Sequence, residues 1–395
     1  MSRNREASEL KTHDLLYMDN AATSWPKPEE VYRAADGALR SCGNPGRSHH
    51  GHSRAADRIL FDVRGELARF FGGDDPASLV FALNATDALN MAIKGLLETG
   101  DHVLISPYEH NSVLRPLHAM ARDGMISLSE MACDPDAGVD LEGLPALFRD
   151  NTRLVACTHA SNVSGRLMPV EEIAAAAHRR GALFLLDAAQ TAGVYPVDVD
   201  SQGVDLLAFT GHKGLLGPPG VGGLYVRRGI ALRPWREGGT GSRSHEVLQP
   251  EIMPDLLEAG TMNAPAVAGL GAGLEFIRRE GLQRIREHEV SLAGMLREGL
   301  REVRGVTVYG PDDPEEGVAV ISFTLGRADC AHLGFSLEEE FGILSRTGLH
   351  CAPRAHRCLG TFPEGTVRLS PGYFNTEADL GRVLDAVRQI AERAG

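Results

Sequence analysis

Seven short apolar runs alternate with helix-like segments between residues 79 and 227, and this alternation constrains the fold more than any other feature of the sequence. Two of the segments between them, ATDALNMAIKGLLE (85–98) and PVEEIAAAAHRRG (169–181), carry apolar residues at helical spacing. Such repetition predicts an α/β fold with a mostly parallel sheet and helices on both faces, and ligands bind beyond the carboxyl ends of its strands. The runs are LVFAL (79–83), HVLIS (102–106), MISLSEM (125–131), RLVACT (153–158), ALFLLD (182–187), VDLLAFT (204–210) and GGLYVR (222–227).

The pattern changes after about residue 264. A long helical stretch (265–303) leads to GVTVYG (305–310) and VAVISFTL (318–325), whose alternation predicts a half-exposed antiparallel sheet. Helical patterns follow in SLEEEFGI (336–343) and in residues 376–395. We therefore predict a large α/β domain with an N-terminal arm over residues 1–264, and a smaller α+β domain over residues 265–395.

Charge and cysteine content narrow the classes of partner and compartment. The 395 residues carry a formal net charge of −13, which argues against nucleic acid or an anionic membrane as a partner. The first residues are polar, without the apolar stretch of a secretory signal, and no run has the length of a membrane span. Six cysteines are scattered along this long chain, a pattern that predicts free thiols in a reducing cytoplasm.

Two polar segments follow predicted strands and so belong at the ligand-binding edge. Asp187 ends the run ALFLLD, and Gln190 comes three residues later. Taken alone, a strand-end aspartate is more often a helix cap. Lys213 follows VDLLAFT in a glycine-rich turn with Thr210 and His212 and without another charged residue, a setting that suits a partly desolvated, imine-forming lysine.

A third segment is suited to an anion. The run LVFAL is followed by Asn84, and a helix is expected to start near Ala85 and Thr86. Its free backbone N–H groups and the Thr86 hydroxyl would bind a phosphate, or Asn84 and Thr86 would simply cap the helix. The sequence completes neither the G-x-G-x-x-G pattern of dinucleotide-binding folds nor the G-x-x-x-x-G-K-[ST] pattern of P-loops.

The segment TGLHCAPRAHRC (347–358) concentrates cysteine, histidine and arginine. Its spacing lacks the paired ligands of structural zinc sites, so we predict no metal there, and a Cys351–Cys358 disulfide is disfavoured in a reducing compartment. Gly348 and Pro353 indicate a loop. Cations within six residues of Cys351 would favour its reactive thiolate form. They are Arg346, His350, Arg354, His356 and Arg357.

Three further cysteines and a histidine cluster favour simpler interpretations. Cys133 and Cys157 lie in strand-like runs and are expected to be small buried apolar residues. Cys358 is expected to be a bystander, with a resolving thiol or second sulfur carrier as alternatives. The cluster His49, His50 and His52 is interpreted as a rim facing a partner subunit's active site, with metal binding as the alternative.

The ordered motifs resemble the class V aminotransferase fold group of pyridoxal phosphate (PLP) enzymes, and within it the branch of cysteine desulfurases and selenocysteine lyases. The cysteine loop is similar to that of the second desulfurase group. The resemblance covers nearly the whole chain and implies the aspartate aminotransferase-like fold, with a large seven-stranded domain and a smaller α+β domain. Besides the Asp187, Lys213 and Thr86 segments, it rests on YMDNAAT (17–23), YEHNS (108–112), HASNVSG (159–165), EAGTMN (258–263), RTGLHCA (346–352) and VRLSPGYFNT (367–376).

This resemblance implies roles for individual residues. Lys213 would carry the cofactor and act as a catalytic base, Asp187 would face the pyridine nitrogen, and His110 would stack on the ring and shuttle protons. Gln190 and Asn162 would contact the phenolic oxygen. Thr261 would reach a partner subunit's phosphate, which implies a homodimer with shared sites. Phosphate contacts would come from Ala85, Thr86, Thr210 and His212, and substrate contacts from Arg368, Arg346, Asn20 and Ala22. Arg346 could instead order the loop through an ion pair.

The activity implied is that of an L-cysteine desulfurase, in which Cys351 attacks the substrate's sulfur. L-selenocysteine is an alternative substrate. Expected partners are a sulfur-acceptor protein and a second subunit, with iron–sulfur cluster assembly as one use of the sulfur. The alternatives are a selenocysteine lyase, a PLP β-lyase or transaminase that does not use Cys351, and a non-catalytic sulfur- or metal-binding scaffold.

Overall fold

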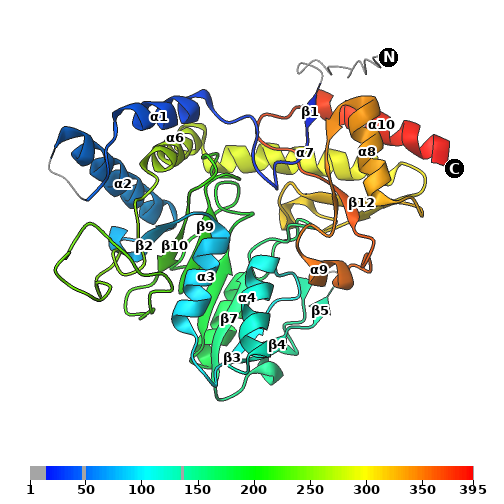
Figure 1. Cartoon of the computed structure of the whole chain (residues 1–395). Helices are drawn as coiled ribbons and strands as arrows, with labels where there is room; N and C mark the ends of the chain where they lie inside the picture. Colours follow the sequence, from blue (N-terminus) through cyan, green and yellow to red (C-terminus); the bar gives the residue numbers. More distant parts are fainter. Residues whose placement is uncertain (1–14, 47–49, 135–137, 395) are drawn as a thin grey trace, which may run out of the picture.

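A computed structural model describes residues 15–46, 50–134 and 138–394 (Figure 1). Most of the predicted N-terminal arm (residues 1–14) and His49 lie outside the described residues. Within the described part of the chain, no helix is both long enough and apolar enough to cross a membrane. Two layers built on separate sheets account for most of the fold.

The first layer is a seven-stranded sheet, as the sequence predicts. Its strand order is β2-β10-β9-β8-β7-β3-β4, and only β10 runs antiparallel to its neighbours. Each of the seven apolar runs forms one of these strands. They are β2 (Leu79–Ala82), β3 (His102–Ile105), β4 (Ser127–Glu130), β7 (Thr152–Thr158), β8 (Leu183–Asp187), β9 (Leu206–Thr210) and β10 (Gly222–Val226).

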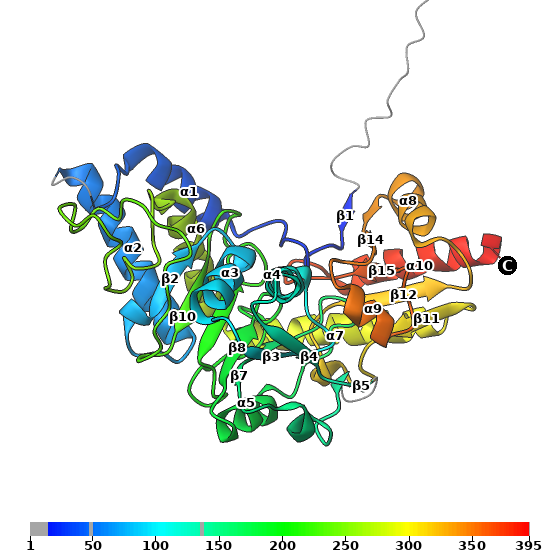
Figure 2. The ribbon, with the colours of Figure 1, turned by 60° about the horizontal axis from the view of Figure 1, so that its bottom comes forward.

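Both faces of this sheet are buried, which explains why its strands are nearly continuous in apolar residues. Side chains alternate between faces along each strand, so Phe184 and Leu186 belong to one core and Leu185 to the other. Full burial of one such side chain stabilises the folded state by about 1.5–3 kcal/mol. In Figure 2, α3 (Ala85–Leu96) and α4 (Asn111–Arg122) lie on one side of the strands and α5 (Val170–Arg179) on the other.

The second layer is a four-stranded antiparallel sheet of order β11-β12-β15-β14, again as predicted. Side chains from α7, α8 and α10 pack with it into a separate core. The strands are β11 (Val306–Tyr309), β12 (Ile321–Leu325), β14 (Arg346–Gly348) and β15 (Thr366–Leu369), and the helices are α7 (Leu282–Arg301), α8 (Cys330–Phe341) and α10 (Glu377–Ala394).

The two layers meet around the helical stretch predicted at 265–303. This stretch is two helices, α6 (Ala264–Glu280) and α7, separated at Gly281, whose φ of 87° is accessible to glycine at little cost. Helix α6 packs against α1 (Glu29–Ser41) and α2 (Gly51–Phe70), whereas α7 reaches the four-stranded sheet (Figure 1). The predicted domain boundary at residues 264–265 falls at the start of α6.

The short elements complete the fold. The pair β1–β13 is parallel and joins residues 16–17 to the second layer. These elements are β1 (Leu16–Tyr17), β5 (Cys133–Asp134), β6 (Gly138–Val139), β13 (Ile343–Leu344), α9 (Pro353–Cys358) and three short 3₁₀ turns at Pro76–Ser78, Leu144–Leu147 and Pro314–Glu316.

Candidate active site

A cavity of about 270 Å³ lies at the carboxyl ends of the parallel strands, where open α/β sheets bind ligands. Residues that follow β2, β3, β7, β8 and β9 all contribute to its wall, because the carboxyl ends of parallel strands meet at one edge of a sheet. Most of the predicted site residues are brought together here. They are Ala22, Ala85, Thr86, His110, Asn162, Asp187, Gln190, Thr210, His212, Lys213, Arg346 and Arg368.

Two predicted site residues line other cavities. Asn20 lines an adjoining cavity whose wall also includes Lys213 and Gln190. There the Asn20 amide donates to the Ser370 carbonyl (3.0 Å) and accepts from the Trp25 N–H (3.1 Å), so its polar atoms already have protein partners. Thr261 lines a third cavity, whose wall does not include the predicted phosphate contacts Ala85, Thr86, Thr210 and His212.

One end of the main cavity is suited to an anion. Helix α3 begins at Ala85, and the Asn84 side chain caps it by accepting the Asp87 N–H (3.0 Å). The Thr86 and Ser112 hydroxyls are hydrogen-bonded to each other (2.7 Å), and the buried Thr210 hydroxyl has no partner among the described residues. An unpaired buried hydroxyl beside a helix N-terminus is what a phosphate oxygen would satisfy.

His110 is held in a fixed orientation at the start of α4. Its Nδ1 accepts the Ser112 N–H (3.1 Å) and lies 2.8 Å from the Ser112 hydroxyl. Burial, reinforced by the nearby Lys213, lowers the pKa of His110 to about 4, so the ring is neutral near pH 7. Ser112 is the last residue of the motif YEHNS, but nothing in the sequence indicates this role.

Asp187 and Lys213 form the ionisable pair of the cavity. Asp187 is 5% exposed and accepts the Ala189 N–H (2.9 Å); burial raises its pKa, whereas that hydrogen bond and Lys213 lower it. Burial lowers the pKa of Lys213 to about 8, against the opposing effect of Asp187. A substantial fraction of Lys213 is therefore a neutral amine near pH 8, as a nucleophile and base requires.

The loop that carries Lys213 is fixed from the N-terminal side. The His212 carbonyl accepts hydrogen bonds from the Ser24 N–H (2.9 Å), the Thr23 hydroxyl (3.0 Å) and the Lys27 ammonium (3.2 Å). These bonds fix the backbone at His212, next to Lys213, whose side chain lines the cavity.

Two arginines stand side by side on adjacent strands at the cavity. Arg368 on β15 pairs in register with Arg346 on β14. Arg368 is fully buried, and its two Nη atoms donate to the Asn162 carbonyl (3.0 Å) and to Asp19 (2.7 Å), while its Nε has no partner among the described residues. Asp19, which sequence analysis missed within YMDNAAT, therefore orients the guanidinium.

Arg368→Lys is expected to lower kcat/KM for an α-amino acid substrate by about tenfold to a hundredfold. A hydrogen bond to a charged group contributes about 1.5–3 kcal/mol, and lysine lacks the planar fork of arginine. Steady-state kinetics of Arg368→Lys would show the loss mainly in KM. Arg304→Lys, in the second layer and away from this cavity, is the control. Unchanged KM in Arg368→Lys would contradict carboxylate binding by this residue.

The cysteine segment differs from the loop that the sequence predicted. It is a short strand (β14), a tight turn and then α9, which begins at Pro353 because proline suits the first position of a helix. In the turn, His350 and Cys351 both have left-handed φ angles (48° and 60°), which costs about 1–2 kcal/mol for each non-glycine residue. Contacts with the rest of the protein must maintain this conformation.

The prediction of five cations around Cys351 is also wrong in part. Arg346 Nη2 lies 3.7 Å from Cys351 Sγ. His350 and His356 are buried and bonded to threonine hydroxyls, and burial lowers their pKa values to about 2 and 4, so both are neutral. Arg354 pairs with Glu130, and Arg357 lies over the Phe362 ring. Helix α9 separates residues that are close in sequence.

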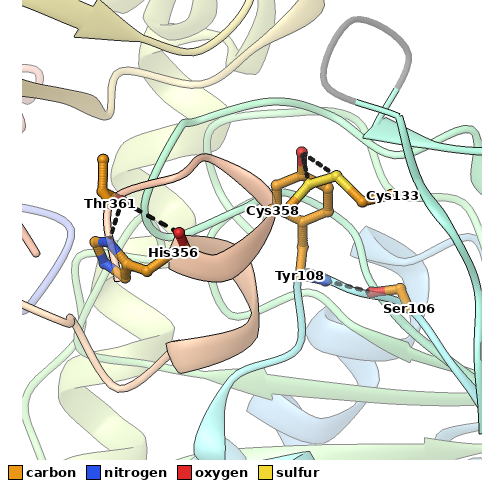
Figure 3. Close-up of a disulfide and its surroundings, with 6 residues drawn as sticks. All are labelled: Ser106, Tyr108, Cys133, His356, Cys358 and Thr361. Atoms are coloured by element: carbon orange, nitrogen blue, oxygen red, sulfur yellow. Dashed lines mark hydrogen bonds between the residues drawn. A yellow bond between two sulfur atoms is a disulfide. The ribbon is translucent and has the colours of Figure 1, made fainter. Parts of the chain in front are cut away.

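The prediction that all cysteines are free thiols is corrected as well. Cys133 and Cys358 form a disulfide, with their Cα atoms 5.9 Å apart (Figure 3). Cys133 is therefore not a simple buried apolar residue, and Cys358 is not a bystander. Cys157 is buried and free, as expected, and Cys351 is free and half-buried.

The sequence predicts no metal site at residues 347–358, and it leaves metal binding as the alternative interpretation of the histidine cluster. Among the residues that the structure describes, no group of three or more His, Cys, Asp or Glu side chains is placed to hold a metal ion. His50 caps α2 by accepting the Ser53 N–H (3.2 Å), and His52 Nδ1 lies 2.5 Å from the Ser41 carbonyl oxygen.

A parallel sheet with an anion-binding helix end, a buried aspartate and a lysine of lowered pKa at its carboxyl edge defines a class of enzymes that act through a phosphorylated carbonyl cofactor. The chain belongs to the class V aminotransferases, a PLP-dependent family whose model matches residues 16–383.

Relatives and solved structures match this chain over nearly its full length. A cysteine desulfurase of Escherichia coli O157:H7 is 33% identical, covering 96% of this chain and 94% of its own. A cysteine desulfurase of Salmonella newport is 32% identical with the same coverage. The apo structure of a cysteine desulfurase from Thermococcus onnurineus NA1 superposes with a TM-score of 0.90 at 33% identity, covering 96% of both chains.

Proposed function

We propose that this chain is a PLP-dependent L-cysteine desulfurase, which converts L-cysteine to L-alanine and retains the sulfur as a persulfide on Cys351. The observation that carries the proposal is the position of Cys351. Its free thiol is held beside Arg346, which lines the same cavity as Lys213 and Arg368. The full-length similarity to proteins named cysteine desulfurases supports the same substrate.

The cavity residues fit pyridoxal phosphate. The unpaired Thr210 hydroxyl and the start of α3, with Ala85, Thr86 and His212 nearby, suit its phosphate. Asp187 suits a protonated pyridine nitrogen, and Gln190, Asn162 and His110 line the remaining wall. When bound, this cofactor supplies an aldehyde that captures the substrate amine and a ring that withdraws electrons from its α carbon.

The side chains then perform the steps of the reaction. Arg368 binds the substrate carboxylate through its fork, and Lys213 removes the proton from the α carbon. Cys351 attacks the substrate Sγ, so that a sulfur–sulfur bond forms as the carbon–sulfur bond breaks. In the balanced reaction, L-cysteine and the Cys351 thiol give L-alanine and the Cys351 persulfide.

A homodimer accounts for the position of Thr261, which we propose completes the phosphate site of a second subunit. Large apolar side chains are exposed on α1, on α2 and at residues 247–248, as an interface requires. Among them are Leu39 (72% exposed), Phe61 (69%), Val247 (99%) and Leu248 (82%).

The persulfide must leave Cys351 before the next turnover, so we propose a sulfur-acceptor protein as a partner. Its sulfur would serve iron–sulfur cluster assembly in the cytoplasm. The half-buried Cys351 is within reach of an incoming thiolate, which would take the outer sulfur by thiol exchange.

Measuring alanine released from L-cysteine and, in parallel, from L-selenocysteine tests the proposed function. We expect alanine from L-cysteine in proportion to the sulfide recovered after reduction. Alanine from L-selenocysteine alone would instead identify a selenocysteine lyase. Pyruvate or a keto acid in place of alanine would identify a β-lyase or a transaminase. Either result would overturn the proposal.

A further inference from the structure

The Cys133–Cys358 disulfide has no part in the reaction proposed above. It joins residues 225 positions apart, one in β5 beside the edge of the seven-stranded sheet and the other at the end of α9. Both cysteines are half-buried, so a small reductant can reach the bond. In cytoplasmic proteins such bonds are usually transient and redox-sensing rather than structural.

Helix α9 links this disulfide directly to the catalytic turn. Cys351 lies two residues before the first residue of α9, and Cys358 is the last residue of α9. Figure 2 shows α9 between the four-stranded sheet and the region of β4 and β5. A bond at Cys358 therefore anchors the far end of the short segment that carries the nucleophile.

The other end of the segment rests on the same part of the large sheet. The Asn111 N–H donates to the Cys351 carbonyl (2.7 Å), and the Asn162 amide donates to the His350 carbonyl (2.6 Å). The buried Tyr108 lies three residues before Asn111, and its hydroxyl is 3.0 Å from Cys358 Sγ and 3.8 Å from Cys133 Sγ (Figure 3). The disulfide and the turn thus contact one continuous stretch, residues 108–111.

An ion pair also links α9 to β4. Arg354 Nε lies 3.4 Å from Glu130 Oε2, but these side chains are 38% and 32% exposed, and partly exposed ion pairs contribute little. The left-handed conformations of His350 and Cys351 are unfavourable in a chain free to relax. Loss of the disulfide therefore removes one anchor of a turn whose conformation is unfavourable by itself, while the hydrogen bonds from Asn111 and Asn162 remain.

We propose that Cys133 and Cys358 form a redox-sensitive clamp, whose disulfide form holds Cys351 beside Arg346 of the cavity wall and whose reduced form loosens the turn. A dithiol reductant opens the clamp: its two thiols form a disulfide, while two electrons and two protons pass to Cys133 and Cys358. A small-molecule disulfide closes it by the reverse exchange. The effect on catalysis rests on the proposed desulfurase function.

The first test is a single-turnover assay on the PLP-loaded enzyme. Oxidised enzyme, and enzyme reduced with dithiothreitol and then desalted, are mixed with L-cysteine, and alanine is measured over milliseconds to seconds, before thiol exchange with the substrate advances. We expect the alanine burst to slow about tenfold in the reduced enzyme, because small displacements of a reacting group lower rates strongly. The Cys133→Ala/Cys358→Ala variant should match the reduced enzyme in both states.

The second test does not depend on activity. Hydrogen exchange, followed by mass spectrometry, should show faster exchange of residues 349–358 after reduction, by about tenfold or more, with β8 amides as the internal control. Cys330→Ala, which removes another half-buried free cysteine, should leave both effects of reduction intact. Equal exchange in the two redox states, or no Cys133–Cys358 peptide in enzyme treated with a small-molecule disulfide, would overturn the clamp. Absence of any alanine burst alongside a clear exchange difference would instead count against the desulfurase function alone.

Discussion

Replacement of Lys213 by alanine is expected to abolish turnover of L-cysteine and to leave the chain folded. The lysine lines the cavity next to Asp187, and burial lowers its pKa to about 8, so it can act both as the attachment point for the cofactor and as a base. Loss of a positioned base alone costs about 10²–10⁴-fold in rate. Alanine release would fall below detection, and the visible absorption of lysine-bound cofactor would disappear.

A matched control is available on α3. Lys94 is an exposed lysine whose ammonium lies over the Trp235 ring, 5.4 Å from its centroid, and Lys94→Ala should retain both activity and the absorption of lysine-bound cofactor. Retained PLP-dependent activity in Lys213→Ala would show that another group performs the lysine's role.

Serine in place of Cys351 should separate binding from sulfur transfer. The substitution leaves Lys213, Asp187 and Arg368 untouched, so PLP and L-cysteine should still bind. A serine hydroxyl is a far weaker nucleophile than a thiol, and it has no sulfur with which to form a persulfide. We expect alanine formation to fall by at least about a hundredfold, while the absorption change on mixing with L-cysteine remains.

Cys330→Ser, in α8, is the control for this variant because Cys330 is another half-buried free thiol. It should desulfurate L-cysteine at the wild-type rate. If Cys351→Ser does the same, the nucleophile lies elsewhere, and a mechanism without a cysteine nucleophile would replace the one proposed here.

Much of the fold was predictable because local pattern and tertiary structure agree. ALFLLD reads as a strand buried on both sides, and β8 is buried on both sides. Asp187 and Lys213 were identifiable as partners although they are 26 residues apart, because each follows a strand and the ends of parallel strands converge. A substrate-binding role for Arg346 and Arg368 came only from the family resemblance. Their direct pairing depends on the register between β14 and β15.

The errors in the prediction have equally physical causes. The connectivity of a disulfide between Cys133 and Cys358 cannot be derived from a sequence in which six cysteines are scattered. The sequence also placed five cations near Cys351, but helix α9 turns most of them away, and burial makes two of the histidines neutral. Proximity in sequence was a poor guide to the electrostatic environment of one sulfur atom.

The most direct test of the central claim is mass spectrometry of the peptide that contains Cys351 after one turnover with L-cysteine, in the absence of reductant. The account predicts that this peptide gains the mass of one sulfur atom, in the same amount as the L-alanine released. Alanine formed without added sulfur on Cys351, or added sulfur on another cysteine with Cys351 unmodified, would contradict it.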